Sequence, residues 1–145
     1  MERFEQRRVA RAPIECCWQV LVDPRRAPEW APFVSDADAE GPPGVGRRLT
    51  VTGSLLGVSM DTSQTVDIWE EPHRYGWCTQ RPFPTRLRVG LTALDEHRTE
   101  IVAAIEADVG AFAAIGARLA NRTIRKQFAR SADRLVALTE DLARR

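Results

Sequence analysis

The chain has 145 residues, of which 43% are hydrophobic and 28% are charged, and its formal net charge is +1. This length allows one domain with a sizeable core, and the composition is ordinary for a globular protein. A net charge this small excludes a strong overall electrostatic attraction to nucleic acid or to an anionic membrane.

Export, membrane insertion and metal binding have no support in the sequence. No apolar run approaches the roughly 20 residues that a transmembrane helix needs. The first residues, MERFEQRR, are charged and lack the apolar centre of a signal peptide, so we expect a cytoplasmic protein. Cys16 and Cys17 are adjacent and Cys78 stands alone, a spacing that favours neither a disulfide nor a metal site. We therefore expect no metal and no cofactor.

The N-terminal part of the chain predicts a strand followed by two short helices. Residues 4–12 alternate loosely and end at Pro13, which suits a helix start because proline lacks the N–H. The stretch LVDPRRAPEWAPF at 21–33 is interrupted by prolines, which end helices. We predict a compact corner there that carries Trp30 and Phe33. The polar residues 35–40 predict a short strand, and the glycines and prolines of 41–46 predict a turn.

Residues 47–109 predict five further strands with one apolar face. Apolar and polar residues alternate over 47–56, 58–69, 75–79, 86–94 and 99–109, and turn residues separate these segments. Arg86 and Arg88 are expected on the opposite, solvated face. The side chains that the alternation places on the apolar, concave face are Leu49, Val51, Met60, Thr62, Gln64, Val66, Ile68, Tyr75, Trp77, Thr79, Leu87, Val89, Leu91, Ile101 and Ile105.

The last part of the chain, from about residue 110, predicts a long helix with two apolar stripes. One stripe, at helical spacing, consists of Ile124, Phe128, Leu135, Leu138 and Leu142. The other consists of Phe112, Ile115 and Leu119, and it is offset from the first by roughly a third of a turn or more. We predict that the second half of the helix packs on the sheet and that its first half faces or caps a cavity.

This order of elements resembles the helix-grip arrangement. Three segments carry the likeness: LVDPRRAPEW at 21–30, EEPHRYGW at 70–77 and RLVALTEDL at 134–142. The chain resembles the polyketide cyclase/START-like superfamily, also called SRPBCC or Bet v 1-like, over nearly its whole length. The resemblance implies an α+β fold in which a curved antiparallel sheet of about seven strands wraps around a long C-terminal helix. It also implies that residues 1–145 form a single START-like ligand-binding domain.

The function that the resemblance implies is the binding of a small hydrophobic molecule, lipid or polyketide-like, in a cavity between the sheet and the C-terminal helix. Apolar walls would give affinity, and a few polar groups would orient the ligand. The polar candidates are Thr62, Gln64, Thr79 and Tyr75. The full set of expected ligand-binding residues is Trp30, Phe33, Val51, Met60, Thr62, Gln64, Val66, Tyr75, Trp77, Thr79, Val89, Phe112, Ile115 and Leu119.

Two other functions remain open at this point. One is a polyketide cyclase or dehydratase, for which Tyr75, Arg86 and Arg88 are the catalytic candidates; a β-bulge would be needed to turn the two arginines inward. The other is a protein-interaction module that uses the cavity little. The expected partner is a small hydrophobic ligand and not nucleic acid, and the chain is expected to be a monomer or a homodimer. The cations of the last helix are expected to form a solvated face: Arg118, Arg122, Arg125, Lys126, Arg130 and Arg134.

Overall fold

One antiparallel sheet forms most of the molecule. The computed structural model describes all residues except 56, 82, 109 and 111–115. Seven strands form the sheet in the order β1-β7-β6-β5-β4-β3-β2, and every neighbouring pair is antiparallel. The strands are β1 (Glu2–Ala10), β2 (Val34–Glu40), β3 (Arg48–Leu55), β4 (Val58–Glu70), β5 (Arg74–Thr79), β6 (Thr85–Asp95) and β7 (Arg98–Ala107).

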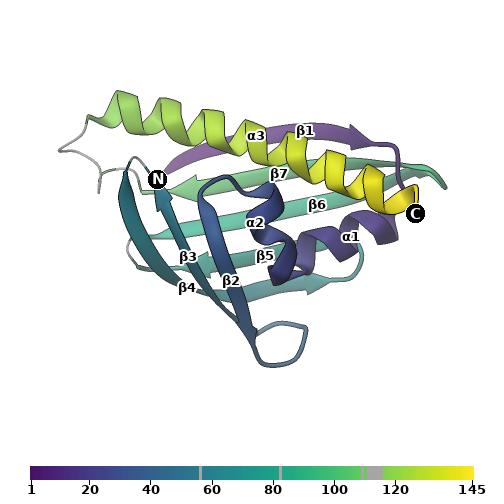
Figure 1. The fold of residues 1–145 in the computed structure, drawn as a ribbon, viewed down its shortest axis with the longest axis horizontal. Coiled ribbons are helices and arrows are strands. Elements are labelled where there is room, and N and C mark those ends of the chain that lie inside the picture. The colour runs from purple at the N-terminus through teal and green to yellow at the C-terminus, as the bar shows by residue number, and fades with distance from the viewer. Residues whose placement is uncertain (56, 82, 109, 111–115) are drawn as a thin grey trace.

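The helices lie on the concave face of this sheet. They are α1 (Ile14–Val22), the 3-10 helix η1 (Pro24–Arg26), α2 (Ala27–Trp30) and α3 (Ala117–Ala143). Figure 1 shows α3 crossing the sheet, with α1 and α2 beside its C-terminal half. The predicted helix-grip fold, including the proline-punctuated corner after the first strand, is confirmed.

The long helix α3 presents a buried stripe to the sheet. Ile124, Phe128 and Leu135 are buried, as their spacing predicts. Leu119 was expected to face or cap the cavity, and in the structure this residue is 50% exposed. The helix begins only at Ala117, so Leu119 lies in its first turn and away from the buried stripe. The other two members of that predicted stripe, Phe112 and Ile115, lie outside the described residues.

A bulge in β4 changes which side chains face the core. The register between β4 and β5 shifts between Val66 and Ile68. Since side chains alternate along a strand, an extra residue moves every later side chain to the other face. The prediction that Ile68 faces the concave side is therefore wrong, and Trp69 points inward instead.

The inward turn of Trp69 completes an aromatic cluster, which consists of Trp18, Trp69 and Tyr75. The ring centroids of Trp18 and Trp69 lie 5.2 Å apart, those of Trp69 and Tyr75 lie 5.9 Å apart, and those of Trp18 and Tyr75 lie 6.1 Å apart. All three pairs are edge-to-face, the arrangement that aromatic quadrupoles favour. The aromatic cluster fills the space between α1 and the bulged end of β4.

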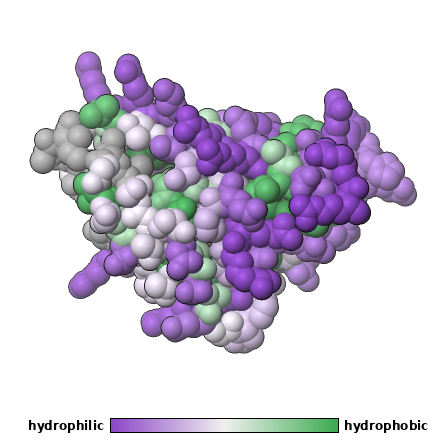
Figure 2. All heavy atoms as spheres, viewed as in Figure 1, coloured by the Kyte–Doolittle hydropathy of each residue, from purple (hydrophilic) through white to green (hydrophobic). Residues whose placement is uncertain are grey.

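The outer surface is largely hydrophilic on the side that carries α3. Figure 2 shows hydrophilic side chains over much of this face, with small apolar patches between them. The six cations of α3 are exposed, as predicted for a solvated helix face. Within the described ranges, no helix has the length and hydropathy needed to cross a membrane.

Candidate ligand-binding cavity

A cavity of two adjoining chambers lies between the concave face of the sheet and α3. The chambers have volumes of about 90 Å³ and about 80 Å³. The two chambers adjoin each other, because several of the same side chains line both of them. The shared side chains are Phe33, Val51, Gln64, Trp77, Ile105 and Phe128.

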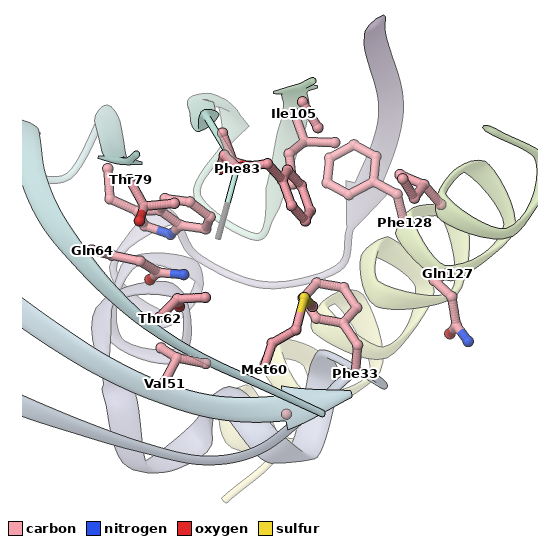
Figure 3. Close-up of a pocket in the computed structure, with 15 residues that line it drawn as sticks. Phe33, Val51, Met60, Thr62, Gln64, Thr79, Phe83, Ile105, Gln127 and Phe128 are labelled. Carbon is pink, nitrogen blue, oxygen red and sulfur yellow. Dashed lines mark hydrogen bonds between the residues drawn. The ribbon is translucent and has the colours of Figure 1, made fainter. Parts of the chain in front are cut away.

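The first chamber, drawn in Figure 3, is walled mainly by apolar side chains. Among the described residues that line it, none is ionisable. The residues outside the described ranges have no ionisable side chains either, since they are Leu56, Pro82, Val109 and the apolar residues 111–115. Besides the shared side chains, its lining consists of Gly53, Met60, Thr62, Thr79, Phe83, Thr85, Ala107, Ile124 and Gln127.

The second chamber extends from the shared side chains toward the corner formed by η1 and α2. Trp30 and Tyr75 are among the side chains that line it. Among its described lining residues, Asp23 is the one that carries a charge at neutral pH, since Tyr75 is a neutral phenol there. The Asp23 carboxylate lies 3.5 Å from the Nε atoms of both Arg25 and Arg26 and accepts a hydrogen bond from the Arg25 backbone N–H at 3.0 Å. The charge at this end of the cavity is therefore compensated locally.

Phe33 reaches the cavity because β3 contains a glycine opposite it. A Cβ atom at Gly53 would overlap the backbone carbonyl oxygen of Phe33. The same carbonyl accepts a hydrogen bond from the Ser54 N–H at 2.9 Å. Glycine inside a strand often marks such a close backbone approach, so the sequence TVTGSL held a signal for this contact.

Two of the threonines in the first chamber already have partners. The Thr79 hydroxyl lies 2.8 Å from the Ser63 carbonyl oxygen and 2.9 Å from that of Arg81, and its single O–H is shared between these two acceptors. The Thr85 hydroxyl donates to the carbonyl oxygen of Phe83 at 3.2 Å. By contrast, the Thr62 Oγ1 atom is buried and has no partner within the described chain. The unpaired polar side-chain atoms of this chamber therefore include Thr62 Oγ1 on β4 and Gln127 Oε1 on α3.

Gln64 is the polar side chain at the boundary between the chambers. It is only 9% exposed, and its amide makes no hydrogen bond within the part of the chain that the structure describes. Figure 3 shows the amide pointing into the hollow. Since neither polar atom of the amide is committed to a protein partner within the described residues, this position is suited to a polar group of a ligand.

The structure brings together many of the residues that the sequence predicted for ligand binding, but not all of them. Val66 and Val89 are packed in the core and line neither chamber. Sequence reasoning missed Gly53, Phe83 and Gln127. A phenylalanine between two prolines is a signal that could have identified Phe83. The predicted residues that line a chamber are Trp30, Phe33, Val51, Met60, Thr62, Gln64, Tyr75, Trp77 and Thr79.

The two arginines considered for catalysis lie on the outer face of the sheet, as their alternation predicts. The Arg88 guanidinium binds both oxygens of Asp67, with Nη1–Oδ1 at 3.1 Å and Nη2–Oδ2 at 2.9 Å. Arg86 Nη2 lies 3.1 Å from Glu106 Oε2. The β4 bulge does not affect β6, so neither arginine reaches the cavity.

Tyr75, the third catalytic candidate, belongs to the aromatic cluster. Burial raises the pKa of its phenol to about 12, although the nearby Arg47 charge acts in the opposite direction. The phenol therefore stays protonated at neutral pH, and its ring is held between Trp18 and Trp69.

The fold and the cavity together define a helix-grip protein with an interior cavity. Residues 1–140 match the family described as "Polyketide cyclase / dehydrase and lipid transport", and the chain belongs to this family. Among curated proteins, no sequence matches the chain.

Solved structures share this fold at low sequence identity. The Zhui aromatase/cyclase from Streptomyces sp. R1128 is 13% identical with a TM-score of 0.78, over 96% of this chain and 93% of that one. A START superfamily protein from Mycobacterium smegmatis is 14% identical with a TM-score of 0.70, over 98% and 97% of the two chains. The di-domain ARO/CYC BexL of the BE-7585A biosynthetic pathway is 15% identical with a TM-score of 0.74 over 99% of this chain. This chain spans about half of that protein, since the match covers 50% of it.

Proposed function

We propose that the protein binds a small hydrophobic molecule in the cavity between the concave face of the sheet and α3. The observation that carries this proposal is the uncharged first chamber, whose walls are mostly apolar and continue into a second chamber. Apolar surface that leaves water on binding contributes roughly 25 cal/mol per Å². Membership in a family of polyketide cyclases, dehydrases and lipid transport proteins supports the same kind of ligand.

A cyclase or dehydratase activity is the second candidate, and the family membership favours it. Such an enzyme needs an acid–base or charge-stabilising group that can touch the substrate. Arg86 and Arg88 are paired with carboxylates on the outer face, and Tyr75 is held in the aromatic cluster. None of the described residues that line the first chamber is ionisable. We therefore propose ligand binding, and not catalysis by these three residues, as the main function.

The experiment that tests the proposal fills the boundary between the chambers. Val51 lines both chambers, whereas its neighbour Thr50 is exposed on the opposite face of β3. We expect the neutral fluorescent probe N-phenylnaphthylamine to bind the wild-type protein and to lose at least about tenfold in affinity in Val51→Trp. The matched variant Thr50→Trp adds the same ring outside the cavity and should bind as the wild type does.

Two results would contradict the proposal. One is the failure of the wild-type protein to bind the probe. The other is equal binding by Val51→Trp and Thr50→Trp while both variants remain folded by circular dichroism. Either result would favour an interaction module that makes little use of its cavity.

A further inference from the structure

The buried amide of Gln64 has a position and a chemistry that narrow the ligand class. The side chain is 9% exposed and makes no hydrogen bond within the described residues. Figure 3 shows the amide nitrogen turned toward the cavity. A primary amide offers both an N–H donor and a carbonyl acceptor, so it can bind a ketone oxygen, a hydroxyl or another amide.

The place of Gln64 between the chambers determines where the ligand's polar group lies. Gln64 lines both chambers, and the other side chains at this boundary are apolar. Phe33 and Phe128 are among them. A ligand whose oxygen meets Gln64 therefore places apolar parts in both directions, one in each chamber. A polar group at the end of a chain would not be flanked in this way.

The absence of charge along the first chamber excludes an ionised ligand group there. No described lining residue of this chamber can pair with a carboxylate, and burying an unpaired ion costs several kcal/mol. In the second chamber, the Asp23 carboxylate is paired with the guanidinium groups of Arg25 and Arg26, which are not among the described lining residues. A ligand carboxylate would find no free cation in either chamber among the described lining residues.

We infer that the cavity takes an uncharged apolar molecule with a carbonyl or hydroxyl group near the middle of its skeleton, and that Gln64 binds this oxygen. This inference rests on the proposed function, because it specifies the ligand of the same cavity. It distinguishes an internally oxygenated molecule from a pure hydrocarbon and from a free fatty acid.

Three matched molecules test the ligand class on the unmodified protein. Fluorenone has a carbonyl group between two aromatic rings, and fluorene has the same rings without the oxygen. Fluorene carboxylate carries a charged carboxylate group on the carbon that bears the oxygen in fluorenone. Because fluorenone can form one neutral hydrogen bond with the Gln64 amide, we predict that it binds about 2- to 10-fold more tightly than fluorene. Fluorene carboxylate should bind at least about tenfold more weakly than fluorene. Competition against N-phenylnaphthylamine measures all three affinities.

A matched pair of variants tests the role of Gln64. Gln64→Met keeps an unbranched side chain and removes the amide, so the preference for fluorenone over fluorene should disappear while fluorene still binds. Gln19→Met makes the same change on the exposed face of α1, and it should keep the wild-type preference. The ligand comparison on the wild-type chain does not depend on the folding of either variant.

The outcomes separate this inference from the proposed function. If N-phenylnaphthylamine binds but fluorenone is not preferred over fluorene, the inference is wrong and the proposed function stands. The inference is also wrong if fluorene carboxylate binds most tightly, or if folded Gln64→Met keeps the preference for fluorenone. If N-phenylnaphthylamine does not bind the wild-type protein, the proposed function fails, and the inference fails with it.

Discussion

Tyr75 and Trp77 lie on the same face of β5, two positions apart, yet their surroundings differ. Tyr75 is 4% exposed, touches two tryptophan rings of the aromatic cluster, and borders only the second chamber. Trp77 is half-buried and lines both chambers of the cavity. One end of the concave face is therefore packed, and the other end is hollow.

The difference between the two ends comes from the elements that cover them. At the packed end, α1 inserts Trp18, and the β4 bulge turns Trp69 inward to meet it. At the hollow end, Trp77 lines both chambers together with Phe33 and Phe128, and the space between the lining side chains is unfilled. The helices and loops that cover an apolar sheet face thus determine whether it packs as core or lines a cavity.

The largest expected effect distinguishes tryptophans at the two ends. We predict that Trp18→Ala lowers the free energy of unfolding by about 3–5 kcal/mol, because it removes a buried ring from a packed cluster. Trp77→Ala should cost less than half as much, because Trp77 already borders empty space. Urea denaturation of both variants checks this, and equal losses would contradict the distinction between a packed and a hollow end.

The next effect concerns the glycine that lets Phe33 approach the cavity. We predict that Gly53→Ala lowers the free energy of unfolding by about 1–3 kcal/mol, because the new Cβ overlaps the Phe33 carbonyl oxygen. It should also weaken N-phenylnaphthylamine binding, since Phe33 lines both chambers. The control is Gly90→Ala in β6, where a Cβ would meet no atom within 4 Å. Denaturation and probe titration check both variants, and wild-type behaviour of Gly53→Ala would contradict this account of Phe33.

A smaller effect is expected on the outer face of the sheet. The Arg88–Asp67 pair is bidentate, but the two side chains remain 30% and 33% exposed. We predict that Arg88→Ala lowers the free energy of unfolding by about 1 kcal/mol and leaves probe affinity unchanged. A large loss of probe affinity in a folded Arg88→Ala protein would show that the ion pair on the outer face influences the cavity, and it would contradict this prediction.

The smallest expected effect on stability at neutral pH concerns the ionisation of the Tyr75 phenol, which lies in the aromatic cluster. Tyr75 is the only tyrosine, so the absorbance of tyrosinate reports it alone. We predict a midpoint near pH 12 in the folded protein and near pH 10 in urea, because burial raises the pKa from its ordinary value of 10.0 to about 12. The folded state holds the proton more tightly, so this group favours folding below pH 10, and its contribution is lost as the pH rises through about 12. A folded midpoint near pH 10 would mean that Tyr75 is solvated.

The sequence predicted the fold and much of the cavity, but it could not predict how the space is divided. Alternation placed Gln64, Trp77 and Val51 on the concave face because it depends only on strand geometry. The alternation gave the wrong face for Ile68, because one extra residue in β4 turns the side chains that follow it to the opposite face of the sheet.

Which concave residues contact a cavity depends on contacts from distant elements. Val66 and Met60 share one face of β4, but Val66 is fully buried in the core, whereas Met60 lines the first chamber. Nothing local to β4 distinguishes them. Likewise, no local pattern shows that the Thr79 hydroxyl is bound to backbone carbonyls while the Gln64 amide is free.

The central claim, that one end of the concave face is hollow and binds a ligand, is tested most directly by the indole N–H signals of the four tryptophans in NMR spectra. On titration with fluorenone, we predict that the signal of Trp77, which lines both chambers, shifts most, and that those of Trp18 and Trp69 shift least. Larger shifts at Trp18 and Trp69 than at Trp77 would contradict the account, because they would place the ligand at the end of the sheet that the structure shows as packed.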